Sequence, residues 1–69
     1  MDDSVITSKI KTLLLQDEFL KAFQIRVETY KGIVQLSGFV DSQETVEKAG
    51  QIAGSVKGIK SVNNNLSVK

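Results

Sequence analysis

The chain has 69 residues, nine Lys and Arg against eight Asp and Glu for a net charge of +1, and no His, Cys, Pro or Trp. A chain of this length forms one small domain, and without cysteine it has no disulfide and no thiolate metal site. The near-neutral charge excludes the basic excess typical of nucleic-acid binding. We therefore expect one domain over residues 1–69, with its core from about 3 to 68, that takes no nucleic acid, metal or cofactor.

Membrane and export signals are absent from the sequence pattern. The longest apolar run is Leu13 to Leu15, whereas a membrane-spanning helix needs about 20 predominantly apolar residues, so the chain is not expected to be transmembrane. Met1 to Ser4 is acidic and does not resemble a signal peptide. The sequence by itself thus predicts either a cytoplasmic protein or an excised domain.

The first predicted element is a helix from about Val5 to Gln16, which begins after two residues that favour helix caps, Asp3 and Ser4. An apolar stripe about 100° wide runs along one side, with Asp17 at its end: Ile6, Ile10, Leu13 and Leu14. Leu15 falls on the opposite, outer side, near Lys11. After the helix, three apolar residues are expected to close the end of the core: Phe19, Leu20 and Phe23.

Alternation of apolar and polar residues then predicts two strands, Ile25 to Tyr30 and Ile33 to Val40. Lys31 and Gly32 lie between them, and Gly32 supplies the positive φ that a tight hairpin turn needs. A second glycine, Gly38, falls late in the second strand and is expected to be structural.

The second helix is predicted to begin at Asp41 and Ser42, with a reciprocal Asp41/Glu44 cap and a Glu44–Lys48 pair along its surface, and to end at Gly58 as its C-cap. Its buried stripe is Val46, Ala49, Ala53 and Val56. Its solvent-facing side is expected to carry Glu44, Glu47, Lys48, Gln51 and Ser55. Gly50, Gly54 and Gly58 recur every four residues, which favours close packing against a neighbouring element.

The last predicted strand runs from Ser61 to Lys69, with Val62, Asn64, Leu66 and Val68 on its inner face. A buried amide needs partners, so we expect Asn64 to bond to backbone at the sheet edge or a helix end. The predicted architecture is an α+β, two-layer αββαβ sandwich in which two helices cover one face of a three-stranded sheet.

The ordered set of motifs in these elements closely resembles the BON domain. The motifs are Ile25-x-Val27, Gly32-Ile33-Val34-x-Leu36-x-Gly38-x-Val40, Ala49 and Ala53, Val56-Lys57-Gly58-Ile59, and Val62-Asn63-Asn64-x-Leu66-x-Val68. The resemblance covers Asp3 to Val68 and departs at Lys31, where many relatives have Asn or Asp. It implies an αββαβ module of the bacterial envelope, usually periplasmic, that is non-enzymatic, often part of a tandem or multidomain parent, and proposed to associate with phospholipid membranes. It carries over no ligand site.

Catalysis is not expected, because without His or Cys the serines have no ordinary activating base and there is no thiolate nucleophile. For lipid binding, an outward Leu15 beside Lys11 suits contact with an anionic phospholipid surface. Isolated surface leucines are also ordinary, so Lys11 and Leu15 are candidates only.

The uncovered sheet face offers an alternative, which is contact with a neighbouring protein domain or partner through Tyr30, Ile33 and Phe39. Aromatic residues on a bare sheet also occur in RNA-binding domains, but those work beside a positive groove, and Glu28 opposes the lone cation Arg26 here. The third interpretation is a solvent-exposed sheet face on which the apolar residues are scattered and have no binding role. The side chains expected on this face are Arg26, Glu28, Tyr30, Ile33, Gln35, Ser37, Phe39, Asn63, Asn65 and Ser67.

Overall fold

The computed structural model describes residues 2–69 and contains the predicted elements in the predicted order. They are α1 (Asp3–Gln16), the 3-10 helix η1 (Leu20–Ala22), β1 (Ile25–Tyr30), β2 (Ile33–Val40), α2 (Gln43–Gly54) and β3 (Ser61–Val68). The predicted αββαβ order is confirmed, and η1 is an addition in the segment after α1. Met1, part of the amino-terminal pattern considered above, lies outside the described residues.

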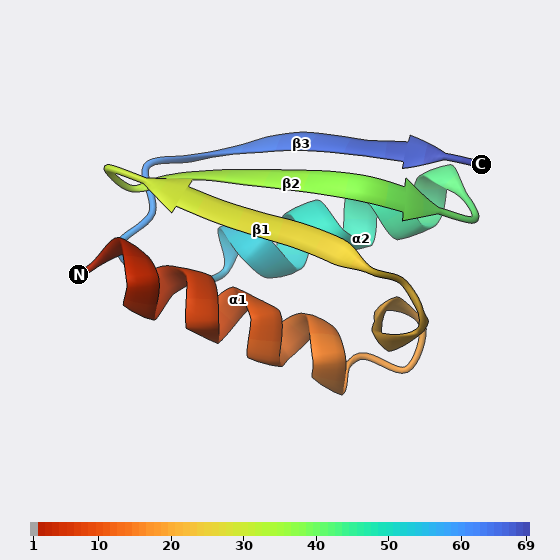
Figure 1. Ribbon diagram of the computed structural model, residues 1–69, viewed down its shortest axis with the longest axis horizontal. Helices are drawn as coiled ribbons and strands as arrows, with labels where there is room; N and C mark the ends of the chain where they lie inside the picture. Colours follow the sequence, from red (N-terminus) through yellow and green to blue (C-terminus); the bar gives the residue numbers. More distant parts are fainter. Residues whose placement is uncertain (1) are drawn as a thin grey trace.

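The sheet has the strand order β1-β2-β3, with β2 antiparallel to β1 and parallel to β3. Because parallel strands cannot be joined by a tight turn, the chain crosses from β2 to β3 through α2. Figure 1 shows α1 running alongside β1 and α2 behind the strands, and both helices pack against the buried face of the sheet. The predicted two-layer arrangement is therefore confirmed, and in the part of the chain that the structure describes no helix lies over the other sheet face.

One hydrophobic core joins the two layers, and it includes Leu20, which closes the core at the end of α1. Its buried members are Ile6, Ile10, Leu14, Leu20, Val27, Val34, Leu36, Val40, Val46, Ala49, Ala53, Val56 and Leu66. Three residues predicted to lie in the core are exposed instead: Leu13 is 37% exposed, Phe19 is 67% exposed and Val68 is 50% exposed. Leu13 lies at the border of the apolar stripe of α1, and Val68 is the last residue of the edge strand β3.

The start of α1 is tied to the β1–β2 turn. The Asp2 side chain caps the helix by accepting from the Ser4 backbone N–H, so the cap lies one residue before the predicted pair. Asp3 instead accepts from the backbone N–H groups of Lys31 (2.7 Å) and Gly32 (3.0 Å). Lys31 and Gly32 both have positive φ, 51° and 83°, as a tight hairpin turn requires. The Asp3 carboxylate therefore holds this turn against the helix.

The boundaries predicted for α2 were wrong at both ends. The cap is Ser42, whose hydroxyl accepts from the Thr45 backbone N–H, while Asp41 accepts from the Thr45 hydroxyl and Glu44 takes no part. The helix begins one residue later than an Asp41 cap requires, which places Thr45 and not Glu44 in the third helical position.

At its other end α2 stops at Gly54, and Ser55 is the C-cap. The Ser55 hydroxyl donates to the Ile52 carbonyl at 2.7 Å and closes the last turn before Gly58 is reached. Gly58 lies in the connection to β3 with φ 95°, and Gly38 has φ 131° within β2.

Asn64 joins β3 to α2. Its Nδ2 donates to the Val46 carbonyl at 2.7 Å and its Oδ1 accepts from the Leu66 backbone N–H at 3.3 Å, which confirms the expected backbone partners. A Cβ on Gly50 would lie 2.7 Å from Asn64 Nδ2, so glycine lets strand and helix approach here. Gly54 has no such neighbour within 4 Å, so of the two glycines within α2 only Gly50 is packed closely.

Candidate functional site

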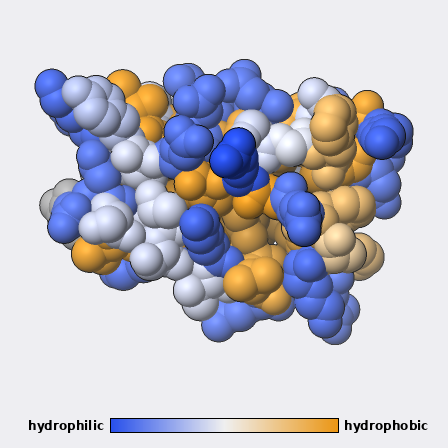
Figure 2. Space-filling model, in the orientation of Figure 1, coloured by the Kyte–Doolittle hydropathy of each residue, from blue (hydrophilic) through white to orange (hydrophobic). Residues whose placement is uncertain are grey.

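The end of α1 carries an exposed apolar side chain next to the core. Leu15 is 67% exposed, whereas its neighbour Leu14 is 5% exposed and belongs to the core. Both line a hollow of about 320 Å³, which we call the α1-end hollow. It is lined by Lys11, Leu14, Leu15, Leu20, Lys21, Ala22, Phe23, Gln24 and Ile25. Figure 2 shows hydrophobic surface, interrupted by hydrophilic side chains, over the half of the molecule that contains the end of α1.

Two lysines from different elements border the α1-end hollow. Lys11 comes from α1 and Lys21 from η1, and both are exposed. Lys11 and Leu15 are four residues apart on α1, which puts them on the same side of the helix. The structure therefore brings the two sequence candidates together and adds Lys21, which the sequence analysis missed because the turn of η1 carries no periodic signal.

A small polar network holds η1 in place beside α1. Asp17 Oδ1 accepts from the backbone N–H groups of Phe19 (2.9 Å) and Leu20 (3.1 Å), and its Oδ2 pairs with Lys48 Nζ at 3.0 Å. Lys48 Nζ also lies 4.9 Å from the centre of the Phe19 ring. The predicted Glu44–Lys48 pair is replaced by this contact between α2 and the end of α1.

The ionised form of Asp17 is favoured by these contacts. The hydrogen bond from Lys48, helped by the backbone N–H groups of Leu20 and Phe19 and by the charge of Lys48, outweighs burial and lowers the pKa of Asp17 below its ordinary value. Asp17 therefore neutralises Lys48. Lys11 and Lys21 are the cations that border the hollow itself.

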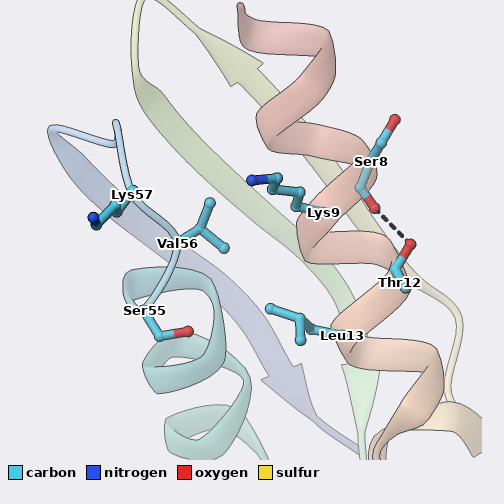
Figure 3. A pocket seen from close by; sticks show the side chains of 7 residues that line it. All are labelled: Ser8, Lys9, Thr12, Leu13, Ser55, Val56 and Lys57. Carbon is cyan, nitrogen blue, oxygen red and sulfur yellow. Dashed lines mark hydrogen bonds between the residues drawn. The ribbon is translucent and has the colours of Figure 1, made fainter. Parts of the chain in front are cut away.

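A second hollow lies between α1 and the segment after α2, and we call it the α1–α2 groove. It measures about 480 Å³ and is lined by Ser8, Lys9, Thr12, Leu13, Ser55, Val56 and Lys57. Figure 3 shows Lys9 and Leu13 extending from α1 towards Val56, while the Lys57 amine points away from α1. Because α2 ends at Gly54, no helical turn covers Leu13 here, which explains why its predicted burial was wrong.

The uncovered sheet face is divided into rows by the strand register. One end row holds Tyr30, Ile33 and Ser61, and Phe39 pairs with Ser67 at the other end. Between them lie two polar rows, Glu28–Gln35–Asn63 and Arg26–Ser37–Asn65. Ile33 and Phe39 are six residues apart on β2, about 20 Å at strand spacing. The structure therefore brings Tyr30 and Ile33 together and leaves Phe39 separate.

The exposed aromatic rings at both ends of this face lie close to lysines. Lys31 Nζ is 5.4 Å from the centre of the Tyr30 ring, and Lys69 Nζ is 5.6 Å from that of Phe39. Tyr30 and Phe39 are 70% and 61% exposed. The cations lie beside the rings and not in a groove between them, so this face lacks the continuous positive track of single-strand nucleic-acid platforms.

Comparison with known proteins agrees with the fold. The family model described as "BON domain" matches residues 2–69 of the chain. The chain belongs to the BON domain family. This BON domain is also 48% identical over 67 residues to osmotically-inducible protein Y of Escherichia coli (strain K12), an alignment that covers 97% of the chain and 33% of that relative. It thus spans about one third of the length of this curated relative.

Residues 2–69 of this BON domain show neither a metal-binding cluster nor a membrane-spanning helix. Within that range no group of three or more His, Cys, Asp or Glu side chains is placed to hold a metal ion. Neither α1 nor α2 combines the length and the apolar content that crossing a bilayer demands.

Proposed function

We propose that this BON domain is a non-catalytic binding module of the bacterial envelope that contacts anionic phospholipid through the α1-end hollow. The supporting observation is the two-thirds exposed Leu15, which lies beside Lys11 and Lys21 at the border of a hollow floored by Leu14 and Leu20. Lysines next to an exposed leucine match a surface whose headgroups are anionic and whose interior is apolar.

The strength expected of this contact is modest. A single leucine and two lysines bury little apolar area, and the attraction of each lysine to anionic lipid is worth about 1 kcal/mol near the surface. A weak module becomes effective when several copies act together. The BON resemblance, which implies tandem or multidomain parents, and a curated relative three times as long support a parent with further domains.

The biological setting is part of the proposal. The family resemblance implies an envelope and usually periplasmic location, and the relative's name says that it is osmotically inducible. We infer that the parent of this domain acts at the envelope during osmotic stress. Binding to anionic lipid weakens as ionic strength rises, so the membrane contact would change with the salt concentration around the protein.

An amide NMR titration of the 69-residue chain with lipid bicelles tests the proposal. One series contains phosphatidylglycerol, the other only phosphatidylcholine, and each is run at low and moderate salt. We expect salt-sensitive shifts with the anionic lipid alone, centred on Lys11, Leu15 and Lys21. Shifts centred on the sheet face, shifts equal for both lipids, or no shifts would overturn it.

A second candidate function is docking of a neighbouring protein domain on the uncovered sheet face. The observation in its favour is the adjacency of Tyr30 and Ile33, 70% and 40% exposed, in one end row of the sheet. Phe39 would belong to a separate contact. Replacing Tyr30 with Ser would abolish such docking and leave lipid binding intact. A pull-down with the adjoining domain of the parent measures the docking.

A further inference from the structure

Within residues 2–69, the outer edge of β3 has no partner strand. β3 (Ser61–Val68) pairs with β2 on one side only, because the sheet ends there. Figure 1 shows β3 along the upper border of the molecule, with no further element beyond it. Its outward N–H and C=O groups are therefore open to another strand, except that the Leu66 N–H donates to Asn64 Oδ1 at 3.3 Å, a contact that an added strand would replace.

The two edges of this sheet differ in how they resist pairing. β1 is six residues long and carries Arg26 and Glu28, charges of the kind that protect natural edges. β3 is eight residues long and has no charged residue or proline between Ser61 and Val68. Its register with β2 is continuous from Ser61 to Val68, so no bulge twists the edge away. The β3 edge therefore lacks the usual devices against strand addition.

The sequence of β3 indicates which strand fits. Residues 61–67 read Ser-Val-Asn-Asn-Asn-Leu-Ser, which has nearly the same pattern in both directions about Asn64. We propose that a second copy of this chain pairs antiparallel with the β3 edge, with a two-fold axis at Asn64. Like then faces like: Ser61 opposite Ser67, Val62 opposite Leu66, and Asn63 opposite Asn65. The two three-stranded sheets become one continuous sheet.

The faces of the strand agree with this register. Leu66 is 8% exposed on the helix side, and Val62 packs partly buried against the core there, so their pairing extends the apolar layer of each copy. Asn63 and Asn65 are exposed on the other side. Moving the axis to Asn65 would set Asn64 against Leu66, and a one-residue slip of one strand would place apolar side chains on the polar face.

The contact is limited in extent. It consists of one strand pair, and at each end Lys60 of one copy comes near Lys69 of the other, where like charges oppose. Small interfaces of this kind are transient, and we expect a dissociation constant on the order of 0.1–1 mM. The pairing involves neither Lys11 nor Leu15, so it does not depend on the proposed lipid contact.

Charge pairs at Asn63 and Asn65 test the register. In the proposed dimer these positions face each other, so N63K/N65K opposes like charges and N63K/N65E opposes unlike charges. Both variants change the same two exposed residues, and each serves as the control of the other. We expect their dimerisation constants, measured by sedimentation equilibrium, to differ by about tenfold or more, with N63K/N65E the tighter dimer. Equal constants would overturn the proposal, as would a folded wild type that stays monomeric at about 1 mM.

Disulfide trapping gives a second measurement. The chain has no cysteine, so Asn63→Cys and Asn65→Cys each introduce a single thiol. Opposite Cα atoms in an antiparallel pair are about 4.5–5.5 Å apart, within disulfide range. An equimolar mixture should give mainly the 63–65 product by mass spectrometry, while a mixture of Arg26→Cys and Glu28→Cys on β1 should give no preferred product. A random distribution of products from the Asn63 and Asn65 mixture would overturn the antiparallel pairing about Asn64.

Discussion

The α1-end hollow and the uncovered sheet face both expose large apolar side chains, but they organise them differently. At the hollow, Leu15 lies next to the core residues Leu14 and Leu20. On the sheet, Phe39 is separated by two polar rows from the Tyr30–Ile33 pair. Similar exposure, 67% for Leu15 and 70% for Tyr30, therefore belongs to a side chain next to the core in one region and to a pair separated from Phe39 by polar rows in the other.

Electrostatics separates the two regions further. Lys11 and Lys21 stand at the border of the hollow, whereas Lys31 and Lys69 lie beside the aromatic rings at opposite ends of the sheet. The two regions therefore differ in how cations and apolar groups are combined: two lysines share one hollow with Leu15, whereas each exposed ring of the sheet lies beside a single lysine.

The largest expected effect comes from removing the floor of the hollow. Leu20 is 1% exposed, so Leu20→Ala should destabilise the fold by about 2–5 kcal/mol through the lost apolar contacts and the cavity left behind. Leu15→Ala should change stability by no more than about 0.5 kcal/mol because its side chain is in solvent. Urea unfolding measures both. Similar losses would mean that Leu15 is part of the core and not a recognition residue.

Removing the apolar side chain of Leu15 should have the next largest effect, on binding. Leu15→Gln keeps a good helix former in α1 and should weaken partition into phosphatidylglycerol vesicles by about tenfold. Phe39→Ser, the matched change on the sheet, should leave partition unchanged. Vesicle co-sedimentation distinguishes the two variants, and the reverse order would assign lipid contact to the sheet face.

The lysines should contribute less than the leucine. Lys21→Gln should reduce binding to anionic vesicles by about fivefold, because each lysine near such a surface contributes about 1 kcal/mol. Lys31→Gln, beside Tyr30, removes the same charge from the other region and should reduce binding far less. Equal losses from both variants would show that net charge governs the attraction and that the position of the lysine does not.

The smallest expected effect concerns the network that positions η1. Because contacts with Lys48 and backbone N–H groups lower the pKa of Asp17, its ionised form stabilises the folded state. This contribution is present above the ordinary carboxyl value of about 3.9 and is lost as the pH falls through the lowered value. The free energy of unfolding of Asp17→Asn should therefore fall less steeply than that of wild type between about pH 6 and pH 2. Parallel pH profiles would contradict a stabilising role for the ionised group.

The helix and strand patterns were predictable from the sequence because they follow local periods. Alternation over Ile25–Tyr30 and Ile33–Val40 placed both strands, and the stripe through Val46 and Ala53 identified the buried side of α2. The outward position of Leu15 followed from the same reasoning. Asn64 was predictable because a buried amide must be satisfied, although its partner, the Val46 carbonyl, was not.

Other features depended on residues far apart in the chain. Lys48 has Glu44 one helical turn away but pairs with Asp17, because the end of α1 packs beside α2. Lys21 became a border residue of the hollow only through the turn of η1. Leu13 could not be distinguished from Leu14 on a helical wheel, since its exposure depends on where α2 stops.

The sequence by itself determined the order of elements and most of their buried sides, because these depend on the spacing of apolar residues along the chain. The resemblance to the BON family rested on an ordered set of motifs. Only the tertiary structure decided which exposed side chains lie together: Leu15 with two lysines, Tyr30 with Ile33, and Phe39 apart from both. A period of 3.6 or 2 assigns each residue to a face, whereas strand register and helix ends decide which residues from different elements share a surface.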